Sequence, residues 1–352
     1  MNILITGASG FVGKALLEFW RESDHFLIGT AQVLPVEPRT EEKSSPVDVG
    51  RGGVSQDAIS SDVTSGCRER KSDRNEEKQK VNWVRVEELE TAEWETMLKG
   101  MDAVVHLAAR VHQMHDGPDA ARLYHQTNVE GTRRLAEAAQ QAGVKRFVFV
   151  SSIKAMGEET RPGTVWTEET PCRPLDAYGE SKLAAEELLL DMHRKSGFPV
   201  VILRPPLMYG PGVKGNMASL MNLVARGWPI PVGGMDNRRS FLGVRNMASA
   251  IDAAVSHSAA PGKVFLVSDG APISTAQLVT AMGDALGKKP LIVSLPGFLW
   301  RMGAALPFVG PRVRRLSGSL ALSNARLCTE LGWKPPFPMI DTLREAFGEG
   351  EK

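Results

Sequence analysis

The sequence predicts an α/β fold, with a doubly wound parallel sheet followed by a smaller C-terminal α/β part. Strand-like and helix-like segments alternate along the N-terminal part, which is typical of parallel βαβ units. A glycine-rich turn joins the first strand-like segment to the first helix-like one, and Gly and Pro become frequent after residue 204. With 352 residues, 42% apolar and 24% charged, the chain has the composition of a soluble globular protein and the length of two domains.

Apolar runs bounded by turn residues predict the strands, and good helix formers predict the helices between them. Five buried strands are expected over residues 2–6, 25–30, 103–108, 146–151 and 200–203. Three helices are expected over residues 11–21, 128–141 and 178–195. Gly197 is expected to end the last of these helices, because glycine readily adopts the left-handed conformation that closes a helix.

Residues 35–80 break this pattern, because they are rich in Ser, Asp, Glu, Arg and Lys and have almost no aromatic residues. Loops longer than about 12–15 residues are unusual inside compact domains, and this composition is typical of disorder. We interpret the segment as a polar, mobile insertion. The alternative, a small folded insert, has too few apolar residues to be favoured.

Charge and cysteine content exclude several classes of protein. Lys and Arg number 42 against 41 Asp and Glu, so the net charge of +1 gives no basic field for nucleic acid or anionic lipid. The three cysteines, Cys67, Cys172 and Cys328, are an odd number with no zinc-site spacing. A disulfide-rich secreted protein is therefore disfavoured, and a cytoplasmic location is expected.

No secretory signal or membrane-spanning segment is expected. Residues 1–20 are apolar but lack a basic start and a cleavage site, and glycines interrupt them. Residues 291–309 contain Pro296, Arg301 and Pro307. A spanning helix needs about 20 unbroken apolar residues, so the sequence predicts no integral membrane segment.

The turn after the first strand predicts a Rossmann-type dinucleotide site. Glycine there allows a tight turn, close approach to a diphosphate and tight helix packing, while the helix N-terminus directs N–H groups at the phosphates. The candidate cofactor-binding residues of this turn are Gly7, Ser9, Gly10, Phe11, Val12 and Gly13. The structural alternative is a simple turn without a ligand.

The choice between NAD and NADP is left open by the second strand. An acidic residue for the adenosine ribose is expected about 20 residues beyond the turn, but this strand ends in Thr30, Ala31 and Gln32. Glu37 and Arg39 lie further on, inside the insertion.

Tyr178 and Lys182 are four residues apart, so they lie on one face of the predicted helix. A nearby ammonium is expected to lower the pKa of the phenol and make it useful for proton transfer. Ser151 and Ser152 follow the preceding strand, at the edge of the sheet where ligands bind. The alternative is a surface Tyr and Lys without a catalytic role.

These motifs together resemble the extended short-chain dehydrogenase/reductase family, in particular its nucleotide-sugar epimerases, dehydratases and reductases. The resemblance spans nearly the whole chain except the insertion. The matching segments are GASGFVG (7–13), HLAA (106–109), NVEGT (128–132), FVFVSS (147–152), YGESK (178–182), LRPPLMYGPG (203–212), RRSFLGV (238–244) and LGWKPP (331–336).

The resemblance implies a role for each matching residue. Tyr178 would be the acid/base, Lys182 would hold the nicotinamide ribose and tune Tyr178, and Ser152 would bind the sugar C4 oxygen. Asn128 would be a structural or proton-relay residue of the catalytic set. Further cofactor contacts would be Leu107, Ala108, Ala109 and Pro205. Further substrate contacts would be Lys154, Asn216 and Arg239.

Two of these substrate residues have structural alternatives: a helix cap for Asn216 and a solvated surface charge for Arg239. The resemblance also implies two domains. Residues 1–205 with 239–267 would bind the dinucleotide, and residues 206–238 with 268–352 would bind a UDP-sugar.

The resemblance leaves two reactions open and disfavours a third. A 4,6-dehydratase carries Asp-Glu after its catalytic Thr, whereas Ile153 and Lys154 follow Ser152 here. The segments SSIKAMGE (151–158) and ARVHQMHD (109–116) resemble bacterial reductases of UDP-4-keto-6-deoxy-N-acetylhexosamines in O-antigen or capsule synthesis. We therefore favour a 4-ketoreductase. The first alternative is a UDP-sugar 4-epimerase that retains NAD, and the second alternative is a non-catalytic nucleotide-dependent binding protein.

Three weaker expectations complete the hypothesis. His112, His115 and Asp116 lack a further ligand, so no metal site is expected. His106 lies in an apolar strand and is expected to be packed rather than catalytic. A homodimer, common in similar enzymes, would use helices over residues 121–141 and 182–194.

Overall fold

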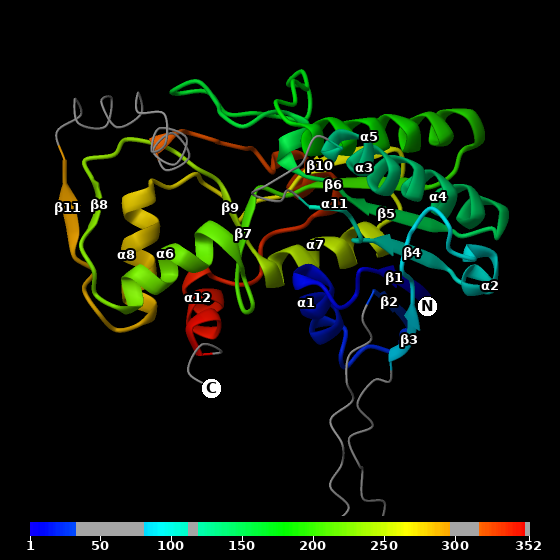
Figure 1. The fold of residues 1–352 in the computed structure, drawn as a ribbon, viewed down its shortest axis with the longest axis horizontal. Coiled ribbons are helices and arrows are strands. Elements are labelled where there is room, and N and C mark those ends of the chain that lie inside the picture. Colours follow the sequence, from blue (N-terminus) through cyan, green and yellow to red (C-terminus); the bar gives the residue numbers. More distant parts are fainter. Residues whose placement is uncertain (33–80, 112–118, 296–316, 349–352) are drawn as a thin grey trace, which may run out of the picture.

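The computed structural model describes residues 1–32, 81–111, 119–295 and 317–348. Its main element is a seven-stranded parallel sheet in the order β10-β6-β5-β4-β1-β2-β3 (Figure 1). The strands are β1 (Asn2–Thr6), β2 (Phe26–Ala31), β3 (Val81–Arg85), β4 (Ala103–His106), β5 (Arg146–Val150), β6 (Val200–Arg204) and β10 (Lys263–Leu266). The strand order reverses between β1 and β4, and such a switch point is where doubly wound folds bind ligands.

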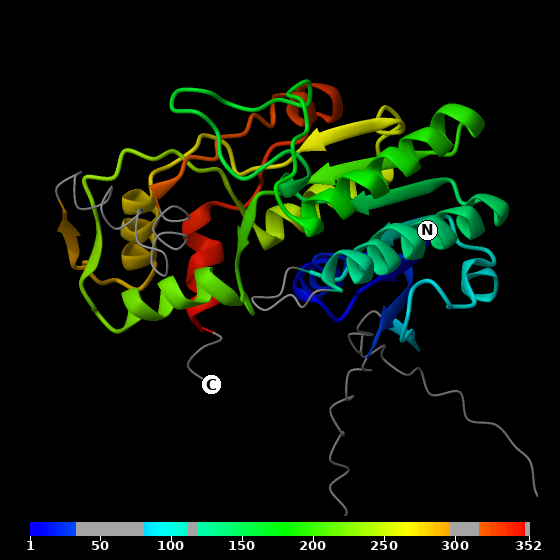
Figure 2. The ribbon, with the colours of Figure 1, turned by 45° about the horizontal axis from the view of Figure 1, so that its top comes forward.

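Helices cover both faces of this sheet because successive side chains of each buried strand point to opposite faces (Figure 2). Ile3 and Ile5 of β1 pack toward α1 (Phe11–Phe19) and α7 (Val244–Ser256). Leu4 packs in the core on the other face. The helices of that other face are α2 (Trp94–Leu98), α4 (Gly131–Gln141) and α5 (Ala177–Ser196), and α3 (Ala120–Tyr124) with the π-helical turn η1 (His125–Glu130) leads into α4.

A smaller C-terminal part lies beyond one end of the sheet (Figure 1). It contains two short parallel pairs, β7 (Leu207–Tyr209) with β9 (Phe241–Gly243) and β8 (Ile230–Gly233) with β11 (Ile292–Ser294). Its helices are α6 (Gly215–Ala225), α8 (Thr275–Ala285) and α12 (Met339–Gly348), which enclose a separate apolar core. α11 (Ala325–Leu331) instead packs beside β10.

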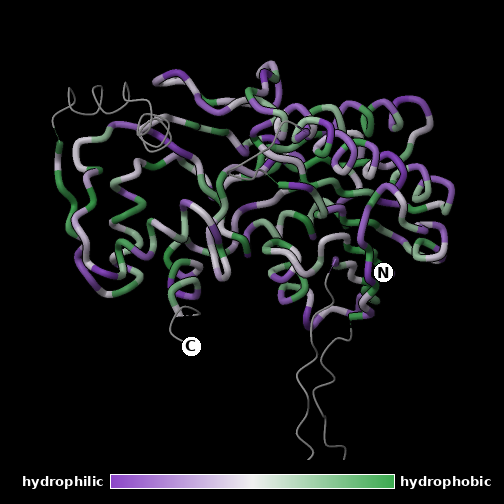
Figure 3. The backbone as a smooth tube through the Cα atoms, viewed as in Figure 1, coloured by the Kyte–Doolittle hydropathy of each residue, from purple (hydrophilic) through white to green (hydrophobic). Residues whose placement is uncertain are grey.

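The hydropathy of the chain agrees with this layering. Hydrophobic residues concentrate in the central strands, whereas hydrophilic residues alternate along the outer helices (Figure 3). Within the described residues, no helix is long and apolar enough to cross a membrane. Cys172 and Cys328 are free thiols, and Cys67 lies outside the described residues.

The fold class is confirmed, and several elements match their predicted bounds. β1 covers residues 2–6 as expected, and α5 begins one residue before Tyr178. Gly197 closes α5 with a φ of +73°, as predicted from its position after the last helical residue.

Two elements differ from the sequence-based expectation. Regular α-helix begins only at Gly131, because Asn128 lies in a π-helical turn that hydrophobic periodicity does not distinguish from a helix. β3 was missed because it is an edge strand in which no residue is fully buried. The expected insertion at residues 35–80 lies outside the described residues.

The proposed division into domains remains a proposal. Within residues 239–267, β10 extends the main sheet beside β6, whereas β9 pairs with β7 in the C-terminal part. α7, from the same range, packs against α1.

Candidate active site

The turn between β1 and α1 requires glycine at two positions. Gly7 has a φ of +71°, and a Cβ there would lie 2.9 Å from the amide nitrogen of Ala108. A Cβ on Gly13 would lie 2.4 Å from the carbonyl oxygen of Ala8. The turn therefore packs directly on its neighbours and exposes backbone rather than side chains to a ligand.

The start of α1 fits an anionic group. Gly10 is the N-cap, and no side chain caps the helix. Phe11, Val12 and Gly13 form the first turn, in which backbone N–H groups have no helical acceptor. Together with the half-buried Ser9 just before the helix, these residues form a cradle suited to the diphosphate of a dinucleotide.

The remaining candidate cofactor residues lie at the same edge of the sheet. The amide of Leu107 donates to the carbonyl of Thr6 over 3.1 Å, and that of Ala108 donates to Thr6 Oγ1 over 3.2 Å. Ala109 follows them, half-buried. Pro205 is buried after β6, where its carbonyl accepts a hydrogen bond from the amide of Ile153 over 3.0 Å.

The end of β2 offers no carboxylate of its own. The strand ends at Ala31, and Gln32 Nε2 donates to the backbone carbonyl of Glu87 over 3.2 Å. The Glu87 side chain itself pairs with Arg85, at 2.8 Å. The described residues thus leave the choice between NAD and NADP open, and Glu37 and Arg39 lie outside them.

Ser152 and Tyr178 are brought together at the carboxyl end of β5. Their side chains are hydrogen-bonded to each other. Asp176 caps α5 by accepting from the amide of Gly179 over 2.7 Å. A Cβ on Gly179 would lie 2.4 Å from the carbonyl oxygen of Lys154, so glycine lets the start of α5 contact the loop that carries Ser152.

Lys182 lies one turn further along α5 and is buried. Its Nζ donates to the carbonyl of Val150 over 2.8 Å and lies 4.3 Å from the ring centroid of Phe149. Burial lowers the pKa of Lys182 to about 7, and the carboxylate of Glu186 opposes this shift. The amine therefore lies behind the end of β5, close to its protonation midpoint at neutral pH.

The expectation that Lys182 lowers the pKa of Tyr178 is wrong for this structure. Burial of the phenol raises the pKa of Tyr178 to about 12, and the hydrogen bond from Ser152 only partly opposes that rise. The reason is that the Lys182 amine is engaged by Val150 rather than by the phenol. Tyr178 is thus a protonated phenol at neutral pH.

Asn128 is buried and ties two parts of the site together. Its Oδ1 accepts from the amide of Arg110 over 2.8 Å, and its Nδ2 donates to the Arg110 carbonyl over 3.1 Å. The same Nδ2 donates to Ser181 Oγ over 2.9 Å. Asn128 therefore fixes the segment after β4 to the catalytic helix, and its π-helical turn places its side chain at this junction.

A buried ion pair behind Lys182 was missed in the sequence. Glu186 accepts from Arg204 Nε over 3.0 Å and also from Ser151 Oγ. These contacts join α5, the end of β5 and the end of β6. Glu186 is one helical turn beyond Lys182, so the helical period of the YGESK segment was the signal that would have identified it.

The three candidate substrate residues have different environments. The Lys154 ammonium pairs with Asp176 and, at 2.9 Å, with Glu158, so the cation is already neutralised. Asn216 is exposed in the first turn of α6. Because Lys214 is the N-cap, the helix-cap interpretation of Asn216 is wrong.

Arg239 is not a solvated surface charge, so that alternative is also wrong. It is half-buried, and its Nη1 donates to the carbonyl of Gly318 over 2.8 Å. Burial lowers the pKa of its guanidinium, which the carboxylates of Glu159 and Glu158 oppose.

His106 is buried, as expected, between two threonines. Thr132 Oγ1 donates to the carbonyl of Asn128 over 2.7 Å and so accepts from His106 Nε2, at 2.9 Å. Thr6 Oγ1, which accepts from Ala108, donates to His106 Nδ1 over 2.6 Å. Burial lowers the pKa of His106 to about 3, so the ring is neutral and links the glycine-rich turn to the turn that carries Asn128.

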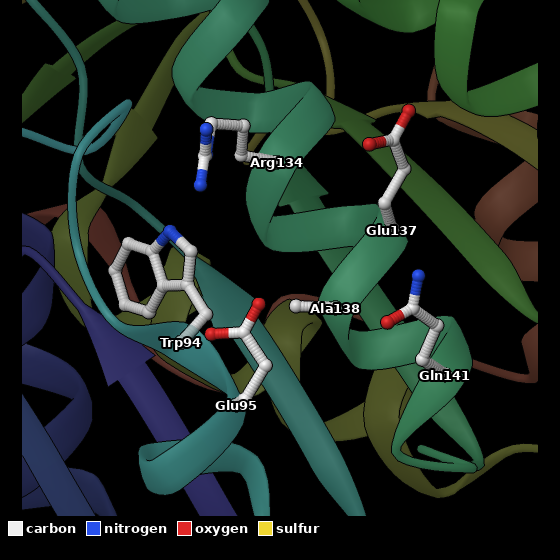
Figure 4. A pocket seen from close by; sticks show the side chains of 6 residues that line it. All are labelled: Trp94, Glu95, Arg134, Glu137, Ala138 and Gln141. Atoms are coloured by element: carbon white, nitrogen blue, oxygen red, sulfur yellow. The ribbon is translucent and has the colours of Figure 1, made fainter.

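No metal cluster is present among the described residues, and His112, His115 and Asp116 lie outside them. A polar cavity of about 220 Å³ lies between α2 and α4, and none of the candidate catalytic residues lines it (Figure 4). Its lining residues are Trp94, Glu95, Arg134, Glu137, Ala138 and Gln141. α4 is one of the helices expected at a dimer contact, and the homodimer itself stays a prediction.

The doubly wound sheet, the diphosphate-type turn and the Ser152–Tyr178–Lys182 group define an α/β enzyme of the nicotinamide-dinucleotide class. The chain matches the model of the NAD dependent epimerase/dehydratase family over residues 3–268. It therefore belongs to this family, which confirms the resemblance, the enzymatic nature of the protein and the expected cofactor, NAD or NADP.

Several relatives of this chain are nucleotide-sugar enzymes. The chain is 40% identical over 259 residues to a UDP-glucose 4-epimerase of Vibrio cholerae, covering 73% of this chain and 78% of that protein. It is 32% identical over 259 residues to a GDP-6-deoxy-D-mannose reductase of Pseudomonas aeruginosa, covering 71% and 80%. The solved UDP-glucuronic acid 4-epimerase of Bacillus cereus shares the fold, with a TM-score of 0.71 at 20% identity and coverage of 100% and 99%.

Proposed function

We propose that this protein transfers hydride at C4 of a UDP-sugar, and that its reaction is the reduction of a UDP-4-keto-6-deoxy-N-acetylhexosamine. The observation that carries this proposal is the hydrogen bond between Ser152 and Tyr178 at the carboxyl edge of the sheet. Two adjacent hydroxyl groups at this edge are placed to bind one substrate oxygen. We assign the reaction to the cytoplasmic synthesis of bacterial surface polysaccharide.

In the proposed mechanism, the turn at Gly7 and Gly13 and the start of α1 would hold the cofactor diphosphate. When bound there, the nicotinamide would supply hydride to C4. Ser152 orients the carbonyl oxygen, and Tyr178 donates its phenolic proton to that oxygen, so that the ketone becomes an alcohol. Burial raises the pKa of Tyr178 to about 12, which keeps the proton on the phenol until it is needed.

Lys182 anchors α5 to the end of β5 beside Tyr178, because its Nζ donates to the carbonyl of Val150 over 2.8 Å. Its amine lies on the next turn of α5, and Glu186 opposes the loss of its charge. Asn128 and Ser181 hold α5 against the segment that follows β4, which keeps Tyr178 in place.

Elimination of water, as in a dehydratase, is not supported. That reaction needs an acid and a base directly after the serine position. Here Ile153 is buried in apolar contacts and Lys154 pairs with two carboxylates. Neither side chain is suited to that role.

The segments SSIKAMGE (151–158) and ARVHQMHD (109–116), which resemble bacterial 4-ketoreductases, favour reduction over epimerisation. The second candidate, a UDP-sugar 4-epimerase with bound NAD, is favoured by the 40% identity to the Vibrio cholerae enzyme.

One experiment separates the two candidates. The freshly purified protein is denatured and any released nicotinamide cofactor is identified and quantified. The protein is also mixed with NADH or NADPH and a UDP-4-keto-6-deoxy-N-acetylhexosamine. An empty site and rapid oxidation of the added cofactor support the reductase. Near-stoichiometric bound NAD⁺, together with interconversion of C4-epimeric UDP-sugars, identifies the protein as the epimerase and contradicts the reductase.

A further inference from the structure

We propose that Arg110 binds an oxygen of the nucleotide sugar, either on its diphosphate or on a polar substituent of the sugar. This inference rests on the proposed function and assigns a binding residue to the same site. Arg110 lies directly after Ala109, where the chain leaves the carboxyl end of β4. Four observations lead to it.

The backbone of Arg110 is fixed relative to the catalytic helix. Asn128 accepts from its amide and donates to its carbonyl, at 2.8 and 3.1 Å. Asn128 also donates to Ser181, whose hydroxyl donates to the carbonyl of Tyr178 over 2.8 Å. A displacement of Arg110 would therefore strain contacts that hold Tyr178 in place.

The side chain of Arg110 lies one aromatic ring away from the reacting phenol. Its guanidinium carbon is 5.7 Å from the ring centroid of Tyr124, in a cation–π contact. The Tyr124 and Tyr178 ring centroids are 6.0 Å apart, with the rings edge to face at 63°. Arg110, Tyr124 and Tyr178 thus form a row at the carboxyl edge of the sheet.

One donor of the Arg110 guanidinium, its buried Nε, has no hydrogen-bond partner in the part of the protein that the structure describes. Other cations of the site are engaged: Lys154 by Asp176 and Glu158, and Arg204 by Glu186. A buried donor without an acceptor is unfavourable. An oxygen that accepts from Arg110 therefore removes this free-energy cost, whereas Lys154 and Arg204 already have their partners.

The chemistry of the guanidinium points to an oxygen ligand. Its planar fork of N–H donors matches phosphate and carboxylate oxygens in pairs and also binds carbonyl oxygens. A UDP-sugar carries such oxygens on its diphosphate and, in an N-acetylhexosamine, on its acetamido group. Both groups offer the same kind of acceptor oxygen, so binding measurements with different nucleotides are needed to tell which group Arg110 contacts.

The test uses the full-length protein and isothermal titration calorimetry. Dissociation constants are measured for UDP, UDP-glucose, UDP-N-acetylglucosamine and NADH with the wild type and with Arg110→Met. Arg344→Met is the matched control, because Arg344 is exposed on α12 and, among the described residues, pairs only with Asp341, at 3.1 Å. If Arg110→Met fails to fold, Arg110→Lys, which keeps the charge but loses the fork, replaces it.

We expect Arg110→Met to weaken nucleotide-sugar binding by about 10- to 100-fold, the range for hydrogen bonds to charged groups, with NADH binding unchanged. Loss for UDP and both sugars identifies the diphosphate as the ligand. Loss for UDP-N-acetylglucosamine alone identifies the acetamido group, and loss for both sugars but not UDP identifies a sugar hydroxyl.

Two results overturn the assignment of Arg110 without affecting the proposed function. One is an unchanged affinity of Arg110→Met for UDP and both UDP-sugars, and the other is weaker binding of NADH alone. A wild-type protein that binds NADH but none of the three nucleotides overturns the proposed function and this assignment with it. A uniform loss for every ligand, together with a lower melting temperature, shows a structural role and also overturns the assignment.

Discussion

The amine of Lys182 donates a hydrogen bond to the carbonyl oxygen of Val150 over 2.8 Å, one helical turn beyond the catalytic phenol. This contact places a titratable amine behind the end of β5 rather than against Tyr178. Burial there lowers the pKa of Lys182 from 10.5 to about 7. In the absence of cofactor, a protonated Lys182 therefore lowers the stability of the folded protein at and below neutral pH.

The first prediction concerns the pH dependence of stability. Because the folded pKa of Lys182 lies below its unfolded value, the unfolded chain binds more protons between about pH 7 and 10.5. The stability contributed by neutral Lys182 is complete above the upper value and is lost as the pH falls through about 7.

We expect the free energy of unfolding of the cofactor-free wild type, relative to Lys182→Met, to rise with pH across this range. Urea unfolding at a series of pH values measures the difference. A difference that stays flat from pH 7 to 10 contradicts the lowered pKa.

The second prediction concerns the buried ion pair behind the site. Replacing Glu186 with Gln leaves the buried guanidinium of Arg204 without a counter-charge. Removing one partner of a buried pair costs about 3–5 kcal/mol, so Glu186→Gln is expected to lower the free energy of unfolding by that order. Chemical unfolding measures it, and Glu187→Gln is the control because Glu187 is exposed on the next position of α5. Equal stability of the two variants would show that the pair contributes nothing.

Local patterns in the sequence predicted the parts of the site that depend on neighbouring residues. The glycine turn needs only the spacing of Gly7, Gly10 and Gly13 between a strand and a helix. The placing of Tyr178 and Lys182 on one helix face needs only the helical period. Both are short-range properties, and both are present in the structure.

Contacts between distant segments could not be predicted in this way. Arg204 meets Glu186 only once β6 has paired beside β5, and Asn128 reaches Arg110 only through a π-helical turn. The pKa of Tyr178 was mispredicted for the same reason. Its value depends on burial and on where the Lys182 amine points, and neither is a property of the spacing between the two residues.

The third prediction concerns the glycine-rich turn. A Cβ on Gly13 would lie 2.4 Å from the carbonyl oxygen of Ala8, which is backbone and cannot move aside cheaply. We expect Gly13→Ala to displace α1 from the turn and to abolish the rise in melting temperature that NAD(H) or NADP(H) gives the wild type. Thermal unfolding with and without cofactor measures this effect.

Gly348→Ala is the control for Gly13→Ala, since a Cβ there meets no atom of the described residues within 4 Å. A Gly13→Ala protein that retains the full cofactor-dependent shift would show that the turn is structural only.

The fourth prediction concerns the proton donor itself. In Tyr178→Phe the ring and its contact with Tyr124 remain, but the hydroxyl that bonds Ser152 is lost. Positioned acid–base groups contribute about 10²- to 10⁴-fold to rate, so we expect kcat to fall by that factor while cofactor binding is retained. Steady-state kinetics and cofactor titration measure the two quantities.

Tyr209→Phe separates this chemical role from a structural one. Tyr209 donates its hydroxyl to Asp269 over 2.6 Å in the C-terminal part, so its loss removes a buried hydrogen bond without removing a proton donor from the site. We expect Tyr209→Phe to unfold at a lower temperature with kcat within a few-fold of the wild type, the reverse of Tyr178→Phe. If the two variants lose kcat in proportion to their loss of stability, Tyr178 acts only by packing, and proton donation to the C4 oxygen must be assigned to another group.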